Sequence, residues 1–430
     1  MTVVSMMAIS AFAIVIQLQF TATLAKNALN LVADWALIEI AISYTLAICA
    51  LGTEATITSL VASRSESKFG SIFLAYMLVA FTIFAVVCAP LLLVVFHFFL
   101  EVSLKRTTQV IFAVGIVNLV SVAAMLLRAS KQYLLASLLE KSHWWGLGLA
   151  VLVYWTTRDH LTLNVFDLIF CVALVIVVPL ACTVFKVLTT FELNQLEIRQ
   201  FIRWTLHNPS TFMLTLNGIL VALYERFDQV VLRAMLGAEA LAVYFICFKI
   251  SFAVRFMTKS INQFFLPLLA RSSIEKGQQS AVAMINKNIK IGSILAVPIV
   301  ALAVFFSSNV LEHFEAAIPD AILAAQILAI SGFLSISNLV VFGYIGTQNG
   351  GKLVLSNGVM SLSVQMVILI LLLPSLNVIA PAVARISAVA VGNSNAYRYA
   401  RKNGHKINLL SNTVFGALML CAVFAYSFIS

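Results

Sequence analysis

Charged side chains are scarce in this sequence. They make up 10% of the 430 residues, whereas hydrophobic residues make up 62%, and the mean hydropathy is +1.02. No soluble domain of ordinary composition approaches these values. Long apolar runs recur along the whole chain, and the connections between them leave no room for a folded soluble domain. We therefore expect a polytopic membrane protein, and we interpret the first apolar run as a retained span, because it lacks a basic leader and a cleavage site.

The residue patterns of metal sites and of common catalytic sites are also missing. The six histidines are isolated, and none stands at metal-ligand or triad spacing. The cysteines lie inside apolar runs without a CxxC pair, so they are interpreted as small core residues. The stretch before Lys352 lacks the first glycine and the Ser/Thr of a phosphate-binding loop. The sequence therefore predicts no enzyme, no metal and no cofactor.

Apolar segments long enough to cross a bilayer are the main feature that is present. Windows of about 20 residues give thirteen candidates. Their expected limits are Val3 to Ala25, Trp35 to Ala62, Ile72 to Leu100, Thr108 to Leu127, Tyr133 to Trp155, Leu161 to Val187, Thr211 to Leu236, Leu241 to Leu269, Ile291 to Leu311, Ile322 to Gly346, Leu353 to Leu373, Val378 to Ala396 and Ile407 to Phe428. The expected fold class is therefore an all-α polytopic membrane protein.

Lysine and arginine are distributed unevenly between the two alternating sets of connections. One set carries most of them, including Arg64, Lys68, Arg271 and Lys276, while the other carries only a few. Short cytoplasmic loops retain basic residues, so the amino terminus is expected in the cytoplasm. The net charge of +10 follows from this topology, and no nucleic-acid partner is expected.

The longest polar connection before the middle of the chain divides the spans into two groups of six. This division predicts two bundles related by a pseudo-two-fold axis, as in many transporters built from repeats. The expected boundaries are 1–188 for the first bundle, 189–208 for a cytoplasmic linker, 209–398 for the second bundle and 407–430 for an additional span.

Several cations lie at apparent membrane depth. Those expected to bind substrate are Arg226, Lys249, Arg255, Lys259 and Arg385. Arg255 and Lys259 are one turn apart on one helix face, and Glu225 and Lys249 are equally far from the turn at Gly237, so we expect these two to pair. Charges inside a bilayer are costly and usually mark a pathway for a charged substrate. A guanidinium suits phosphate oxygens because it offers two parallel hydrogen bonds. The alternative is that these cations are paired or reach the head groups with their long side chains.

Carboxylates also occur inside the spans. Glu54, Asp167, Glu225 and Asp228 are candidates for carrying a coupling H⁺ or Na⁺. The alternative is that some of them only balance the nearby cations.

The region of the seventh and eighth spans resembles a known family. The run from Glu225 to Tyr244 and the later Phe265-Leu266-Pro267-Leu268-Leu269-Ala270-Arg271 are similar to motifs of the polysaccharide transporter family of the multidrug/oligosaccharidyl-lipid/polysaccharide (MOP) exporter superfamily, which includes the Wzx-type O-antigen flippases. Asp228, Gly237, Tyr244 and Lys249 match that pattern. The resemblance covers about half of the chain, and the amino-terminal half is much less distinctive.

The resemblance implies a V-shaped pair of helical bundles, similar to that of MATE transporters, and alternating access. The implied substrate is an undecaprenyl-pyrophosphate-linked oligosaccharide, flipped across the bacterial inner membrane. The implied partners are this glycan, membrane lipids, and polysaccharide polymerase and chain-length proteins. Two alternatives are a multidrug or cation exporter of the same superfamily, which would line its cavity with acids and aromatics, and a membrane polysaccharide polymerase, which would need a large external loop.

Overall fold

The computed structural model describes residues 2–50, 69–130, 132–156, 165–190, 198–199, 202, 209–348 and 350–402. Every regular element in these ranges is a helix. Eight of the helices are long and apolar enough to cross a membrane. The chain packs as two compact units, one formed by Met1–Thr23 with Asp34–Ala222 and the other by Leu24–Ala33 with Leu223–Ser430. This confirms the predicted all-α polytopic fold class.

Unit 1 holds the helices of the first half of the chain. They are α1 (Thr2–Asn27) and α2 (Leu29–Cys49), of which Leu24–Ala33 belong to unit 2, and α4 (Phe69–Ile83), α5 (Ala89–Leu93), α6 (Leu104–Ala129), α7 (Tyr133–Glu140), α8 (Ser142–Thr156) and α9 (Val165–Thr190). Helix α6 is the most buried of the candidate spans in this unit, and it packs against α4, α7 and α9. Many of its apolar side chains, such as Val114 and Leu126, are fully buried, so this helix forms the centre of the unit 1 core.

Two of the expected spans in unit 1 are irregular. The third contains two π-helical segments, Phe84–Cys88 and Val94–Phe99, on either side of the short helix that begins at Ala89 and includes Pro90. Proline supplies no backbone N–H and so disturbs the regular hydrogen bonding of a helix. The fifth is broken at Lys141, which separates α7 from α8. Both spans are therefore assembled from shorter pieces than the apolar runs indicate.

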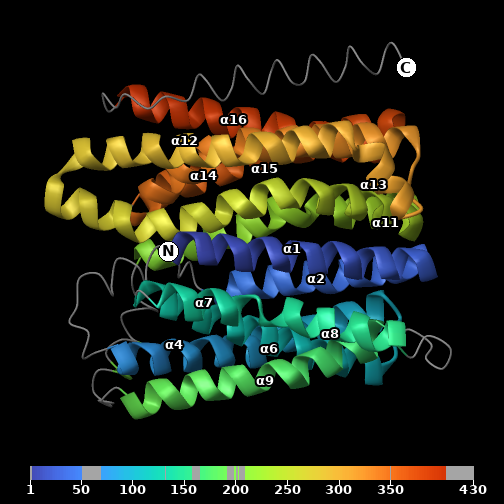
Figure 1. The fold of residues 1–430 in the computed structure, drawn as a ribbon, viewed down its shortest axis with the longest axis horizontal. Coiled ribbons are helices and arrows are strands. Elements are labelled where there is room, and N and C mark those ends of the chain that lie inside the picture. Colours follow the sequence, from blue (N-terminus) through green and yellow to red (C-terminus); the bar gives the residue numbers. More distant parts are fainter. Residues whose placement is uncertain are drawn as a thin grey trace. The chain divides into compact units, whose positions relative to one another are not determined.

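Unit 2 holds the helices of the second half. They are α11 (Pro209–Lys276), whose first residues belong to unit 1, α12 (Gln278–Phe305), α13 (Ser307–His313), α14 (Pro319–Thr347), α15 (Gly351–Leu376) and α16 (Ala380–Lys402). In Figure 1 the long helices α12, α14, α15 and α16 run alongside one another. Buried apolar clusters from α11, α12, α14 and α16 fill the space between them, with Phe333 and Val300 among the members.

Helix α11 contains the expected reversal at Gly237. This residue has φ 92° and ψ −171°, a conformation that is essentially restricted to glycine, because a Cβ atom would clash with the backbone. The reversal brings the arms before and after Gly237 together, as the 2.6 Å hydrogen bond from Tyr244 to Asp228 shows. The seventh and eighth predicted spans are therefore the two arms of one helical hairpin.

The described parts of the first twelve predicted spans are largely helical, while residues 51–62 of the second and 161–164 of the sixth lie outside the described residues. The clearest difference lies between the first two spans. Only Ala28 separates α1 from α2, so Leu31 to Asp34, interpreted from the sequence as a connection, lie inside α2. A polar side chain such as Asp34 is compatible with a helix when it has a partner. Hydropathy alone therefore places the start of the second span too late in the sequence. The predicted thirteenth span and most of the 189–208 linker lie outside the described residues.

Candidate substrate site in unit 2

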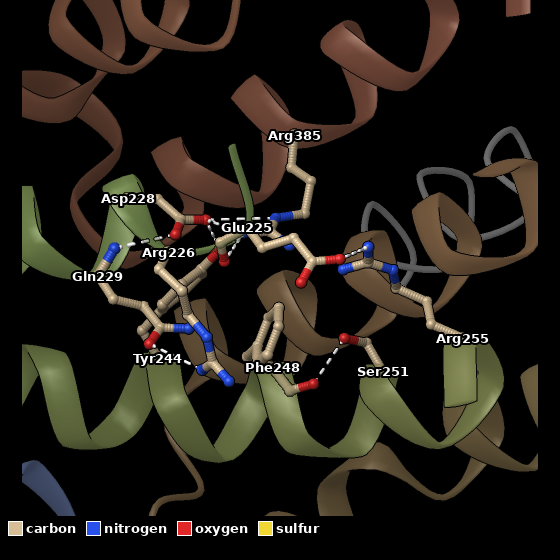
Figure 2. Close-up of polar contacts among 9 residues, drawn as sticks. All are labelled: Glu225, Arg226, Asp228, Gln229, Tyr244, Phe248, Ser251, Arg255 and Arg385. Atoms are coloured by element: carbon tan, nitrogen blue, oxygen red, sulfur yellow. Dashed lines mark hydrogen bonds and ion pairs between the residues drawn. The ribbon is translucent and has the colours of Figure 1, made fainter. Parts of the chain in front are cut away.

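The polar centre of unit 2 is formed by α11 and α16. Figure 2 shows the side chains that meet there: Glu225, Arg226, Asp228, Gln229, Tyr244, Phe248, Ser251, Arg255 and Arg385. All except Arg385 come from the two arms of α11. Arg385 comes from the second turn of α16, 157 residues beyond its partner Asp228. The hairpin at Gly237 therefore brings most of this group together, and α16 completes it.

The Asp228 carboxylate and the Arg385 guanidinium form a buried ion pair. Their nearest atoms, Oδ2 and Nη2, are 2.7 Å apart, and the two side chains are 0% and 2% exposed. The Arg385 Nε also donates to Oδ2 at 3.2 Å, the hydroxyl of Tyr244 donates at 2.6 Å, and the backbone N–H of Gln229 donates to Oδ1 at 2.9 Å. Hydrogen bonds to both oxygens offset the cost of burying the charge.

Aromatic rings surround the guanidinium groups of this centre. The ring of Phe248 lies between them, with centroid distances of 5.1 Å to the guanidinium carbon of Arg226 and 4.8 Å to that of Arg385. Tyr224 faces Arg385 at 5.8 Å. These distances fall within the range of cation–π attraction. Arg226 also donates to the side-chain oxygen of Gln229 at 3.2 Å. Arg226 and Arg385 are thus held between an aromatic face and polar partners.

A second ion pair joins the two arms of the hairpin and is more open. The Nη2 of Arg255 lies 2.7 Å from Oε1 of Glu225, and the side chains are 20% and 33% exposed. Lys259, one turn after Arg255, is exposed. The positive charges that act on Glu225 come from Arg255, Lys259, Arg226 and Arg385. This carboxylate therefore lies in a strongly positive field.

The expected pairing of Glu225 with Lys249 is wrong, because Glu225 bonds to Arg255 instead. The physical reason lies in the direction of the side chains. The Nζ of Lys249 lies over the rings of Phe245 and Phe252 on its own helix, at 4.8 and 5.6 Å from their centroids. Arg255, although further from the turn, reaches Glu225 with its longer side chain.

Three donors of this centre are buried and have no hydrogen-bond partner. They are Nη1 of Arg255, Nη1 of Arg385 and Nε2 of Gln229. The orientation of the Gln229 amide is fixed, because its other atom accepts from Arg226, which can only donate. The unmet groups are thus all nitrogen donors, and a partner for them must be a hydrogen-bond acceptor.

The structure brings together four of the five predicted cations, Arg226, Arg255, Lys259 and Arg385, and two of the four predicted coupling acids, Glu225 and Asp228. Asp167 belongs to unit 1, where it is exposed at the start of α9 and accepts a 2.8 Å hydrogen bond from Gln109 of α6. Glu54 lies outside the described residues. Their roles stay predictions.

The sequence interpretation missed Gln229, Tyr224 and Gly332 as parts of this centre. Gly332 of α14 packs against Arg255, since a Cβ atom at Gly332 would lie 3.0 Å from the Arg255 Cγ. A glycine inside an apolar span can indicate that another helix approaches closely at that point. The sequence does not show which residue packs against Gly332.

Solved structures give the relationship of this fold to known proteins. An outward-facing multidrug resistance MATE family transporter of the MOP superfamily matches with a TM-score of 0.69 and 13% identity, covering 99% of this chain and 96% of that one. MATE in complex with MaL6 matches with a TM-score of 0.71 and 13% identity, covering 93% of this chain and 96% of that one. No protein-family model and no curated protein sequence matches the chain.

A third match is a MOP superfamily transporter from Pyrococcus furiosus, described as having a binding pocket of reverse polarity that suggests a different function. Its TM-score is 0.70, with 13% identity over 98% of this chain and 96% of that one. The protein thus has the fold of the MATE transporters of the MOP superfamily. It is a multi-pass membrane protein, and its structural neighbours are transporters. At these identities the likeness shows the fold and leaves the substrate open.

Proposed function

We propose that the protein is a flippase that moves an undecaprenyl-pyrophosphate-linked oligosaccharide across the bacterial inner membrane by alternating access. The oligosaccharide is the repeat unit of an O-antigen or of a capsule or exopolysaccharide. The amino terminus lies in the cytoplasm, and polysaccharide polymerase and chain-length proteins act on the delivered glycan. The resemblance at α11 and the MOP fold support this assignment.

The observation that carries the proposal is the excess of positive charge in the polar centre of unit 2. Four cations, Arg226, Arg255, Lys259 and Arg385, act on Glu225 there, and the carboxylates of this centre among the described residues are Glu225 and Asp228. Arg255 also has a buried N–H group without a partner. Positive charge at membrane depth is energetically costly, so the cations found there usually serve a function. A pyrophosphate supplies the acceptor oxygens and negative charge that such a centre lacks.

The cations take two roles in this proposal. Arg255, which is partly exposed, and Lys259, which is exposed, contact the pyrophosphate. Arg226, Lys249 and Arg385 are buried, and they raise the local positive potential and hold the contacting groups in place. Among the coupling candidates, Glu225 is accessible to H⁺ or Na⁺, whereas both oxygens of Asp228 already accept hydrogen bonds.

The same charge distribution argues against the two alternatives. A multidrug or cation exporter requires acidic groups to attract its substrate, and this centre is cationic. The reverse polarity described for the transporter from Pyrococcus furiosus is consistent with different substrate charges on one MOP fold. A polymerase requires a large external loop, and the described helices on the expected outer side are joined by short turns, as at Gly237 and Asn377.

The test is a flipping assay in proteoliposomes with undecaprenyl-pyrophosphate carrying a monosaccharide, detected by a membrane-impermeant lectin. Arg255→Ala and Lys259→Ala should each lower the flipping rate at least tenfold, and Arg255→Lys should restore it only in part. Lys352→Ala is the matched control, because Lys352 is an exposed cation at the start of α15. Wild-type rates in both alanine variants, or transport of a cationic drug in place of the lipid, would contradict the proposal.

A further inference from the structure

The two ion pairs of unit 2 lie side by side but differ in accessibility. The pair of Asp228 and Arg385 is sealed, with side-chain exposures of 0% and 2%. The pair of Glu225 and Arg255 is open, with exposures of 33% and 20%. An exposed ion pair contributes little stability, so its partners can be exchanged at low cost, whereas breaking a buried pair is expensive.

The two pairs meet at Glu225, as Figure 2 shows. Its backbone oxygen accepts a 2.8 Å hydrogen bond from Nη2 of Arg385, which fixes the main chain at this point of α11. Its carboxylate makes a single hydrogen bond, to Nη2 of Arg255. The backbone of Glu225 is thus anchored by the sealed pair, while its side chain can move without disturbing the fold.

Arg255 is placed to accept a different anion. Its Nη1 has no partner, so only one side of the guanidinium fork contacts Glu225. A bidentate anion such as a phosphate gains two parallel hydrogen bonds from the same fork. Gly332 supports the stem of Arg255 from α14, and exposed Lys259 adds a second cation one turn away. A phosphate that replaces the Glu225 carboxylate therefore finds more donors than the carboxylate uses.

We infer that Glu225 is an internal counter-ion that a phosphate-bearing ligand displaces from Arg255. This inference rests on the proposed function and adds a release step to it. When Glu225 returns to Arg255 it competes with the bound phosphate, which keeps the affinity low enough for the head group to leave. The displaced carboxylate stays close to Lys259, so the positive centre is never left without a counter-ion.

The test is binding of inorganic pyrophosphate to the purified full-length protein, measured by isothermal titration calorimetry. Glu225→Gln removes the competing charge and should tighten binding on the order of tenfold, while slowing the flipping of the lipid-linked substrate. Glu225→Asp, whose shorter side chain does not reach Arg255, should also tighten binding. Glu239→Gln is the matched control, since it removes the same charge at the exposed hairpin of the same helix. It should leave both measurements unchanged.

Two results separate this inference from the proposed function. If the wild type binds pyrophosphate through Arg255 and flips the lipid, but neither Glu225 variant binds more tightly, the counter-ion role is wrong and the flippase proposal stands. If neither the wild type nor the Glu225 variants bind pyrophosphate and no lipid is flipped, both fail. Thermal unfolding of each variant, with and without pyrophosphate, checks that it is folded and gives a second measure of binding.

Discussion

At the residue scale, the sealed and the open ion pairs should respond differently to truncation. Arg385→Ala leaves the Asp228 carboxylate buried without its cation, and such losses typically cost about 3–5 kcal/mol in unfolding free energy. Arg255→Ala breaks a partly exposed pair, for which about 0–1 kcal/mol is typical. We therefore expect a large fall in the thermal unfolding temperature for Arg385→Ala and a small one for Arg255→Ala.

The same pair of variants distinguishes a residue that stabilises the fold, Arg385, from a residue that contacts the substrate, Arg255. Differential scanning fluorimetry in detergent gives stability, and the flipping assay gives activity. Arg255→Ala should lose transport while staying folded. A double variant, Asp228→Leu with Arg385→Met, removes both buried charges and should recover part of the stability lost in Arg385→Ala. Equal destabilisation by Arg255→Ala and Arg385→Ala would contradict the assignment of a sealed and an open pair.

The sequence alone indicated candidate cations but could not indicate their partners. Neither Arg255 nor Arg385 has an acid next to it in the chain. In the structure Arg255 pairs with an acid 30 residues away and Arg385 with one 157 residues away. The hairpin at Gly237 predicts that the two arms of α11 meet, but it led to Lys249 and not to Arg255 as the partner of Glu225. The contact of Arg385 with Asp228 depends on how α16 packs against α11, and hydropathy does not encode this packing.

At the element scale, the reversal of α11 depends on the backbone freedom of Gly237. Its φ of 92° and ψ of −171° are strained for any residue with a Cβ atom, although that atom would have open space around it. Gly237→Ala should therefore cost about 1–3 kcal/mol through the backbone alone. Asparagine tolerates left-handed helical angles but not these, so Gly237→Asn should be no better.

The matched control for this prediction is Gly218→Ala in the same helix. A Cβ atom there would make only an ordinary 3.6 Å contact with the Ala47 oxygen, and alanine favours a helix by up to about 1 kcal/mol over glycine. Thermal unfolding should show loss for the Gly237 variants and no loss for Gly218→Ala. Equal stability of the two alanine variants would mean that the reversal does not need glycine.

The helical elements themselves could largely be predicted from the sequence, because each apolar run must satisfy its backbone hydrogen bonds internally. The interruptions of these helices could not be predicted in this way. The break at Lys141 coincides with a chain of charges, in which Glu140 bonds both Arg128 and Lys141. The π-helical segments around Pro90 likewise depend on packing within unit 1. Hydropathy averages over such features, so thirteen smooth spans were expected where several are built from pieces.

At the scale of the whole molecule, fold and substrate must be argued separately. The MATE-like fold is shared by transporters with multidrug substrates and by one with a pocket of reverse polarity. In this chain four cations surround Glu225 in the polar centre of unit 2. Under the proposed function, this positive charge would repel cationic drugs as well as attract an anionic head group.

The last prediction concerns the orientation of the chain in the membrane. The basic connections are expected on the cytoplasmic side, which places the hairpin near Glu239 outside and the start of α15 near Lys352 inside. Both residues are exposed, so each can be replaced by cysteine in a variant without native cysteines. A membrane-impermeant maleimide added to intact spheroplasts should label Glu239→Cys at once and Lys352→Cys only after permeabilisation. The reverse order would place the amino terminus outside, and the proposed substrate site of unit 2 would then have to load from the opposite leaflet.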